Sequence, residues 1–270
     1  MFDNKQAAFV QRFGQGPQAA LGIHCSLAHS GALAPLMGVL GGQLTMAAFD
    51  LPGHGRSADW DPARWGAPDY IGAATGTALA LLRQAEGPVH VIGHSFGALV
   101  ALAAAEADPA RVRSLTLIEP VLFAALRGRP EWAAYKAESA PFLDALAAGD
   151  HARTAEQFVG LWGNGLPWAA LDARQRDAFI RRIGLLAEIL PANEGDSAGL
   201  LRPGRPEALA MPVLLLRGDR SPASMWAVLD VLAERIPGAR LEVVAGAGHM
   251  LPLTHPAEVA ALIGALISPG

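Results

Sequence analysis

Residues 88–100 read Pro-Val-His-Val-Ile-Gly-His-Ser-Phe-Gly-Ala-Leu-Val and combine a short apolar segment with a glycine-rich turn. The apolar residues 89–92 predict a strand, and the alanine-rich sequence after the turn, to about Ala107, predicts a helix. The turn has the pattern Gly-x-Ser-x-Gly, with Ser95 at its centre. In such a sharp turn the serine hydroxyl projects clear of the sheet, and the two glycines avoid the clash that a Cβ would cause.

This turn predicts a serine nucleophile. The helix begins next to the serine, so its first backbone N–H groups and the positive end of its dipole face the space above the hydroxyl. A glycine-rich turn with an incidental serine is the simpler alternative, because a pattern of five residues recurs by chance. The apolar strand before the turn and the helix after it favour the nucleophile.

Length and composition indicate a globular α/β protein. The 270 residues suffice for one large domain or two small ones, and 51% hydrophobic against 17% charged residues provide a buried core. No apolar run reaches the roughly 18 residues of a membrane span, and no apolar segment typical of a secretory signal follows the N-terminus. The net charge of −4 predicts neither a nucleic acid nor a membrane as a partner. The single cysteine, Cys25, suits a reducing compartment, and we expect a cytoplasmic protein.

Strands and helices alternate along most of the chain, which predicts a mostly parallel central sheet flanked by helices. The exception is a block at residues 121–210 with helical patterns and no convincing strand. Such a block is too long for a connecting loop and is typical of a lid or a binding element. We therefore expect a core made of residues 1–120 and 211–270, with an inserted helical cap between them. The strand patterns of the core lie at residues 9–13, 19–23, 45–49, 89–92, 114–118, 213–216 and 240–244.

Two further polar residues follow predicted strands, as activation of a serine requires. A serine hydroxyl needs a base within hydrogen-bond reach, and that base needs a group to orient it. Asp219 follows one strand directly, and His249 lies in a glycine-rich loop after the next. Because the carboxyl ends of parallel strands share one edge, we expect both to meet Ser95 there. A Gly-Asp turn or a loop histidine taken singly is more often structural, and Glu119, at another strand end, is a weaker candidate for the acid.

Four motifs resemble those of the α/β-hydrolase superfamily. The resemblance covers nearly the whole chain except residues 125–205 or so. It implies Ser95 as the nucleophile, His249 as general base and then acid, and Asp219 as the carboxylate that orients the histidine. It also implies that the block between the fifth and sixth strands is a helical cap over the active site. The motifs are Asp50-Leu51-Pro52-Gly53-His54-Gly55-Arg56-Ser57, Gly93-His94-Ser95-Phe96-Gly97, Gly218-Asp219 and Gly246-Ala247-Gly248-His249.

The resemblance further implies an oxyanion hole made of two backbone N–H groups. One belongs to Phe96, the residue after the nucleophile. The other belongs to a loop where family members usually carry His-Gly and this chain has His24 followed by Cys25. With cysteine in the glycine position, we expect the N–H of Ser26 to complete the hole, and that of Leu27 is the alternative.

The predicted reaction is acyl transfer to water through an acyl-enzyme. A serine nucleophile speaks against the epoxide hydrolases and haloalkane dehalogenases of the superfamily, which attack with an aspartate. We expect cleavage of a carboxylester, thioester or lactone of a small to medium hydrophobic substrate. Hydrolysis of a C–C bond and perhydrolysis without a cofactor suit the same triad, and a non-catalytic ligand receptor is the alternative of another class. The predicted cap is rich in aromatic residues, some of which are expected to line the pocket: Trp132, Phe142, Phe158, Trp162, Trp168 and Phe179.

No metal or cofactor is expected. The eight histidines show no spacing typical of metal ligands, and the chain has neither a phosphate-binding loop nor a dinucleotide-binding glycine motif. The sequence gives no indication of the oligomeric state.

Overall fold

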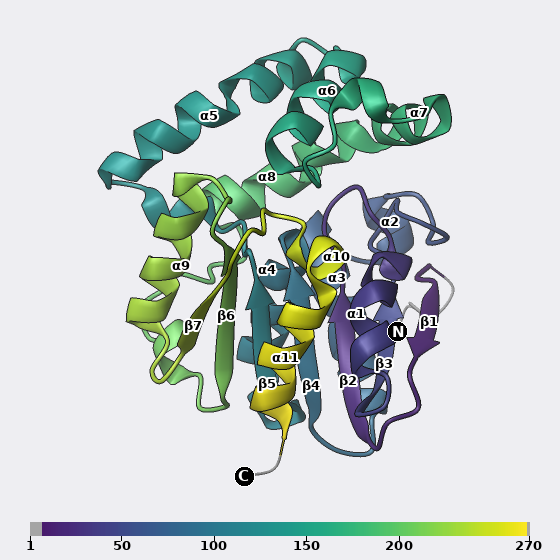
Figure 1. Cartoon of the computed structure of the whole chain (residues 1–270), viewed down its shortest axis with the longest axis vertical. Coiled ribbons are helices and arrows are strands. Elements are labelled where there is room, and N and C mark those ends of the chain that lie inside the picture. Colours follow the sequence, from purple (N-terminus) through teal and green to yellow (C-terminus); the bar gives the residue numbers. More distant parts are fainter. Residues whose placement is uncertain (1–6, 269–270) are drawn as a thin grey trace.

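The computed structural model describes residues 7–268 and contains a seven-stranded sheet with the order β1-β3-β2-β4-β5-β6-β7 (Figure 1). Neighbouring strands are parallel except at one edge, where β1 pairs antiparallel with β3. The predicted mostly parallel sheet is thereby confirmed, and each predicted strand segment forms a strand. The strands are β1 (Val10–Phe13), β2 (Gln18–Ile23), β3 (Leu44–Phe49), β4 (Val89–His94), β5 (Val112–Ile118), β6 (Val213–Gly218) and β7 (Arg240–Val244).

Helices cover both faces of the sheet. One face carries α1 (Ala34–Leu40) and α11 (Pro256–Ile267), which lie in front of the strands in Figure 1. The other face carries α3 (Tyr70–Gln84), α4 (Phe96–Ala107) and α9 (Ala223–Arg235). Apolar side chains on each side form a separate hydrophobic cluster with the sheet between them.

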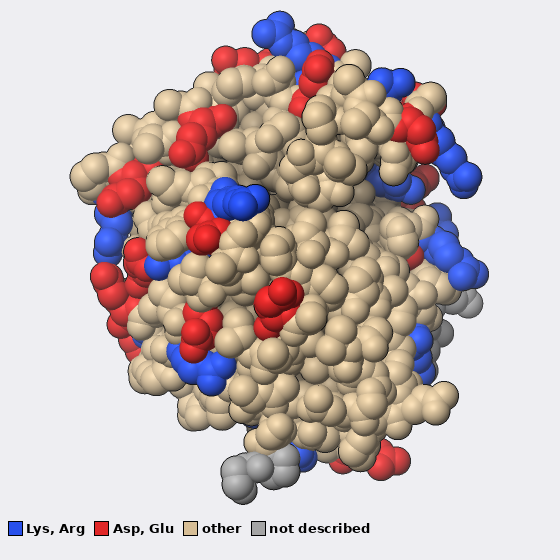
Figure 2. Space-filling model, in the orientation of Figure 1, with Lys and Arg blue, Asp and Glu red and all other residues tan. Residues whose placement is uncertain are grey.

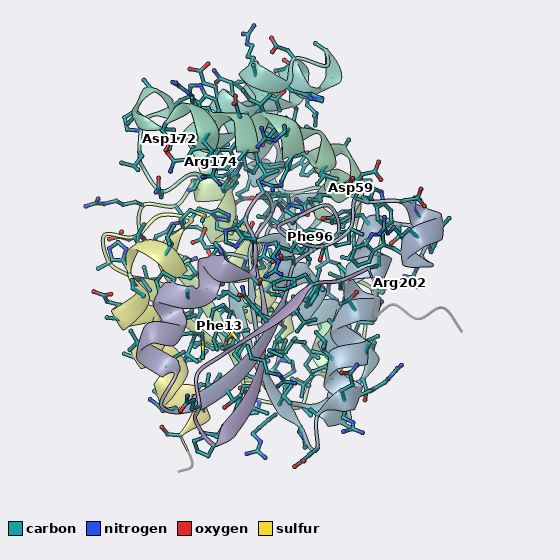
Figure 3. All side chains as sticks on the ribbon, turned by 90° about the vertical axis from the view of Figure 1, so that its right-hand side faces the viewer. Phe13, Asp59, Phe96, Asp172, Arg174 and Arg202 are labelled. Carbon is teal, nitrogen blue, oxygen red and sulfur yellow. The ribbon has the colours of Figure 1, made fainter. Side chains whose placement is uncertain are left out.

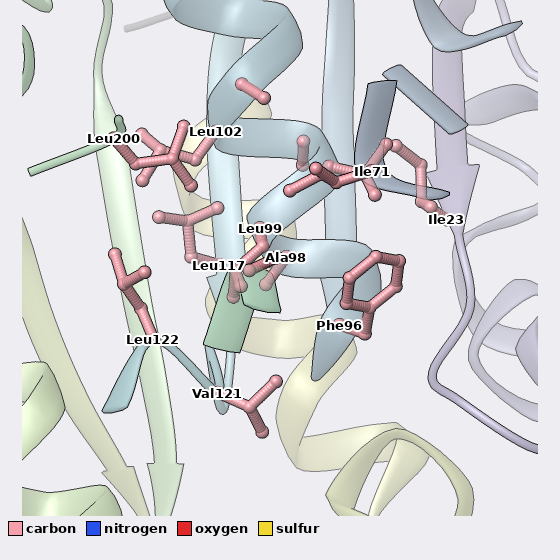
Figure 4. Close-up of a cluster of buried hydrophobic side chains, with 14 of the residues drawn as sticks. Ile23, Ile71, Phe96, Ala98, Leu99, Leu102, Leu117, Val121, Leu122 and Leu200 are labelled. Atoms are coloured by element: carbon pink, nitrogen blue, oxygen red, sulfur yellow. The ribbon is translucent and has the colours of Figure 1, made fainter. Parts of the chain in front are cut away.

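Helix α4 is buried on all sides. Every residue from Phe96 to Ala105 is buried, which is the pattern of a helix in the centre of a domain rather than at its surface. Its many alanines permit close packing against β4 and α3, and Figure 4 shows its leucines beside Leu117 of β5 and Leu200. The helix that begins at the predicted nucleophile is therefore held rigidly by the core.

The segment between β5 and β6 contains helices and no strand. These helices lie over the carboxyl ends of the strands, at the top of Figure 1. The helical pattern over residues 172–190 forms two helices rather than one, because a short 3-10 turn at Ile183–Leu185 divides it. The main helices are α5 (Pro130–Ala147), α6 (His151–Trp162), α7 (Ala173–Arg182) and α8 (Leu186–Gly195).

Two short helices were not expected from the sequence. The segment at residues 58–68 contains α2 (Pro62–Trp65), where Asp61 caps the first turn and proline occupies the first helical position. Helix α10 (Leu251–Thr254) follows the loop that carries His249. Both are single turns, too short to give a periodic pattern in the sequence.

Charged side chains are interspersed on the face of the molecule that Figure 2 shows. Both acidic and basic groups occur on the helical segment at the top, and few charges lie over α11. No helix within residues 7–268 is long and apolar enough to cross a membrane.

Candidate active site

Ser95 lies on a strained turn between β4 and α4. Its backbone has φ 58° and ψ −122°, a conformation that costs a residue other than glycine of the order of 1–3 kcal/mol and that is typical of functional sites. A Cβ on Gly97 would overlap the carbonyl oxygens of Ile23 and His24, and one on Gly93 would overlap the backbone of the first turn of α4. The two glycines thus let the chain reverse within the space between β2 and α4.

The structure brings Ser95 and His249 together. His249 Nε2 is 3.0 Å from Ser95 Oγ, and both side chains are buried. On the other side of the ring, Nδ1 is 3.1 Å from Oε2 of Glu119. A carboxylate oxygen can only accept, so Nδ1 carries the proton and Nε2 is free to accept the hydroxyl proton of Ser95.

Glu119 is built into this position by several interactions. The residue follows β5 directly, has φ 50° and is fully buried. Its Oε1 accepts hydrogen bonds of 2.8 Å from the backbone N–H of Gly218 and from the hydroxyl of Ser221. With His249 on Oε2, each carboxylate oxygen is paired, as burial of a charged group requires.

The structure contradicts the selection of Asp219 as the partner of His249. Asp219 is exposed, and its Oδ1 accepts a 2.7 Å hydrogen bond from the N–H of Gly246. Its own N–H donates to the carbonyl of Val244, so the residue still follows the path of β6 beside β7. Its side chain therefore closes the turn after β7, and Glu119, one strand nearer to Ser95, faces the histidine.

One sequence signal could have favoured Glu119 over Asp219. Glu119 is the only charged residue in the stretch from Ser114 to Ala125, so it was bound to be buried with the strand end. A charge in such a place needs a partner, whereas a Gly-Asp turn at the surface needs none. Ser221, which supports Glu119, gave no recognisable signal.

The loop after β2 leaves the N–H of Ser26 free beside Ser95. The N–H of Leu27 donates 2.9 Å to Nε2 of His54, so this alternative donor is already engaged. Neither the N–H of Ser26 nor that of Phe96 has an acceptor among residues 7–268, and Ser26 lines the same cavity as Ser95. Figure 3 shows Phe96 in the interior, below the start of α7, which Asp172 and Arg174 mark.

Three other histidines surround the site, and each has a fixed partner. His24 accepts from the N–H of Leu51 through Nε2 and donates to the carbonyl of Cys25. His94 donates through Nε2 to the carbonyl of His249 at 2.8 Å and thereby helps to position that loop. Burial lowers the pKa of His54 to about 4 and the pKa values of His24 and His94 to about 3. All three rings are therefore neutral near pH 7.

These buried histidines predict a stability that falls in acid. Their folded-state pKa values lie below the ordinary 6.5, so below pH 6.5 the unfolded chain binds protons that the folded chain does not. As the pH falls from about 7 to about 4, His54 alone is expected to remove on the order of 3 kcal/mol from the free energy of unfolding. Urea unfolding across this range measures the loss.

Two variants isolate this effect. His54→Gln is expected to reduce the pH dependence of the free energy of unfolding, and His151→Gln, at an exposed position, serves as the control substitution. If the free energy of unfolding depended on pH equally in the native protein and in His54→Gln, the lowered pKa of His54 would be contradicted.

A small cavity lies directly above Ser95. It has a volume of about 30 Å³, is bounded below by Ser26, Ser95 and His249, and is closed by side chains from the helical segment. Three of the predicted pocket aromatics, Phe142, Phe158 and Trp162, line it, while the other three pack elsewhere in that segment. The remaining lining residues are Val121, Phe123, Tyr135, Leu186, Ile189, Leu190 and Asn193.

One larger hollow, of about 380 Å³, is lined by His249 together with Arg220 and His255. Other larger hollows lie far from this chemistry. Two, of about 490 and 570 Å³, open at the amino-terminal ends of the strands and share Gln18, His90 and Arg113. Within residues 7–268, no group of three or more His, Cys, Asp or Glu side chains is arranged to hold a metal ion.

Comparison with known proteins identifies a family whose members match most of the chain. Residues 21–262 match the model of the alpha/beta hydrolase family. The chain is 34% identical to lipase LipV of Mycobacterium tuberculosis, over 96% of this chain and 97% of the relative. It is 29% identical to a pimeloyl-[acyl-carrier protein] methyl ester esterase of Methylococcus capsulatus, over 96% and 98% of the two chains.

Solved structures agree in fold. A hydrolase from Oleispira antarctica superimposes with a TM-score of 0.77 at 19% identity, covering 99% of this chain and 97% of that one. The enol-lactonase of Burkholderia xenovorans superimposes with a TM-score of 0.73 at 19% identity, covering 97% and 96%. At this identity, the similarity shows a shared fold.

Proposed function

This chain belongs to the α/β hydrolase family, and we propose that it is a serine hydrolase that cleaves an ester-type bond through an acyl-enzyme on Ser95. The observation that carries the proposal is the run of hydrogen bonds from Ser95 through His249 to Glu119. The relatives named as a lipase and a methyl ester esterase support an ester as the substrate. The bond is that of a carboxylester, thioester or lactone.

Acylation begins with the proton of Ser95. As Oγ attacks the carbonyl carbon, this proton passes to Nε2 of His249, 3.0 Å away. The carbonyl oxygen gains negative charge, and the free N–H groups of Phe96 and Ser26 are placed to stabilise it. When the tetrahedral intermediate collapses, the bond to the leaving group breaks, and the leaving alcohol or thiol takes the proton from His249.

Deacylation repeats the sequence with water. Water loses a proton to Nε2 of His249 and attacks the acyl carbon, and the oxyanion again forms beside the same N–H groups. Collapse breaks the bond to Ser95, whose Oγ takes the proton back. The products are the free acid and the regenerated enzyme.

Glu119 replaces Asp219 as the third member of the triad in this mechanism. Its carboxylate accepts the Nδ1 proton of His249, which fixes the tautomer and stabilises the imidazolium that forms after proton transfer. The backbone N–H of Gly218 and the hydroxyl of Ser221 keep the carboxylate in place. Asp219, whose carboxylate bonds to Gly246, takes no part.

Residues 121–210 act as a cap that selects an apolar substrate. Nearly all side chains that they contribute to the cavity are apolar or aromatic, which favours a hydrophobic group next to the ester. The cavity of about 30 Å³ holds only a water molecule or two, so side chains of the cap must move before an ester can bind.

Rates with p-nitrophenyl esters of increasing acyl length test this function. We expect kcat/KM to rise from the acetate to a medium-length chain and to fall for longer ones. The p-nitrophenyl monoester of succinate, which carries a charge, serves as the control and is expected to react much more slowly. Hydrolysis of charged esters alone would contradict the proposed substrate class.

A further inference from the structure

One face of helix α8 points into the cavity above Ser95. Leu186, Ile189, Leu190 and Asn193 all line the cavity and follow one another at i, i+3, i+4 and i+7. Residues at these spacings share one side of a helix. Three of them are apolar, as expected for a hydrophobic pocket, and the fourth carries an amide.

The amide oxygen of Asn193 has no partner in the protein. Oδ1 is buried and accepts no hydrogen bond from any residue between 7 and 268. Among the residues that line the cavity, it is the only buried side-chain nitrogen or oxygen without one. A buried acceptor left without a donor costs about 1–3 kcal/mol, so its presence in a pocket calls for an explanation.

Neighbouring groups do not supply the missing donor. The hydroxyl of Tyr135, which also lines the cavity, donates 2.8 Å to Oε1 of Glu194. The ammonium group of Lys136 binds the other oxygen of Glu194 at 3.0 Å. Ser95 and His249 are bonded to each other, and neither the hydroxyl of Ser26 nor the indole N–H of Trp162, which also line the cavity, donates to Asn193. Oδ1 is therefore open to a donor on the substrate.

From this arrangement we propose that Asn193 is a specificity residue that accepts a hydrogen bond from the substrate. The substrate is then an ester with an otherwise apolar chain that bears a hydroxyl or N–H group some distance from the ester bond. A purely apolar chain that fills the cavity leaves Oδ1 of Asn193 without a hydrogen-bond donor, whereas a hydroxylated chain supplies one. This inference rests on the proposed function, because it concerns the substrate of the same site.

Pairs of esters that differ by one hydroxyl group test the proposal. In one series the hydroxyl is placed on successive carbons of the acyl chain of p-nitrophenyl esters, and in the other on the alcohol part of acetate esters. The measured quantity is the ratio of kcat/KM for the hydroxylated ester to that of its unsubstituted parent. We expect a ratio of about 3–10 at the best position, the size of one net hydrogen bond.

Variants on the same face of α8 test whether the preference for the hydroxylated ester depends on Asn193. Asn193→Leu is expected to bring it to about 1 or below, and Asn193→Asp, which keeps an acceptor, is expected to retain a preference. Leu190→Met changes the packing of the same cavity without adding or removing a polar group, and is expected to leave the ratio unchanged. A matched keto ester, which accepts but cannot donate, is expected to gain nothing.

Several results would overturn the proposal. These are a ratio near 1 at every position in both series, a preference that survives in Asn193→Leu, and a keto ester favoured as strongly as the hydroxy ester. Hydrolysis of the unsubstituted parent, abolished by Ser95→Ala, shows in each case that the proposed function itself stands. If no parent ester is hydrolysed, the proposed function fails and this inference fails with it.

Discussion

Glu119→Gln is expected to lower kcat/KM for ester hydrolysis by about 10³–10⁴-fold, while Asp219→Asn stays within about threefold of the native value. The glutamine has the same shape as Glu119, so the hydrogen bonds from Gly218 and Ser221 can be kept by its oxygen. Its amide nitrogen then faces Nδ1 of His249 and donates to it. The ring is forced to carry its proton on Nε2, where it can no longer accept the proton of Ser95.

The two substitutions form a matched pair. Each replaces one carboxylate at the end of a neighbouring strand by the corresponding amide, and steady-state rates with one p-nitrophenyl ester compare them directly. Thermal unfolding of both variants shows whether the fold is kept, since Glu119 is buried and Asp219 is exposed. A large loss in Asp219→Asn together with a small one in Glu119→Gln would restore Asp219 to the triad.

Ser95→Ala is expected to lower kcat/KM by about 10⁵-fold or more, the scale on which removal of a nucleophile abolishes triad catalysis. In the proposed mechanism the hydroxyl is the only group of this turn that forms a covalent bond to the substrate, and without it His249 Nε2 has no proton to accept. Ser26→Ala is the control, because it removes a second serine hydroxyl from the same cavity and keeps the backbone N–H assigned to the oxyanion hole. It is expected to change the rate by less than about threefold. Similar losses of kcat/KM in Ser95→Ala and Ser26→Ala would contradict the assignment of Ser95 as the nucleophile.

The fold was predictable because its signals are local. Most of the parallel strands are short, mainly apolar segments between turn signals, and Gly93 and Gly97, where a Cβ does not fit, indicate the strained turn at Ser95. The helices over residues 172–190 were not predictable in detail. The dividing turn at Ile183–Leu185 contains Gly184, but a single glycine inside a helical pattern costs only about 1 kcal/mol and does not by itself mark a break.

The site was predictable only where the fold alone determines it. Ser95 and His249 follow strands at the same sheet edge, so topology brings them together. The choice between Glu119 and Asp219 depends on which way each side chain points after its strand. The N–H of each residue still pairs with the next strand, but Glu119 has φ 50° and its side chain faces the histidine, whereas the carboxylate of Asp219 accepts from Gly246. The proposed role of Asn193 could not be predicted from the sequence, because it depends on the position of the residue in the cavity that α8 faces.

The most direct test of the account is covalent labelling with a p-nitrophenyl alkylphosphonate, which mimics the tetrahedral intermediate and traps the nucleophile. The account predicts release of one p-nitrophenol per chain in step with the loss of esterase activity, and a phosphonate adduct on the peptide that contains Ser95. Labelling is expected to be absent in Ser95→Ala and strongly slowed in Glu119→Gln. An adduct on any other residue, or full esterase activity after stoichiometric labelling, would contradict it.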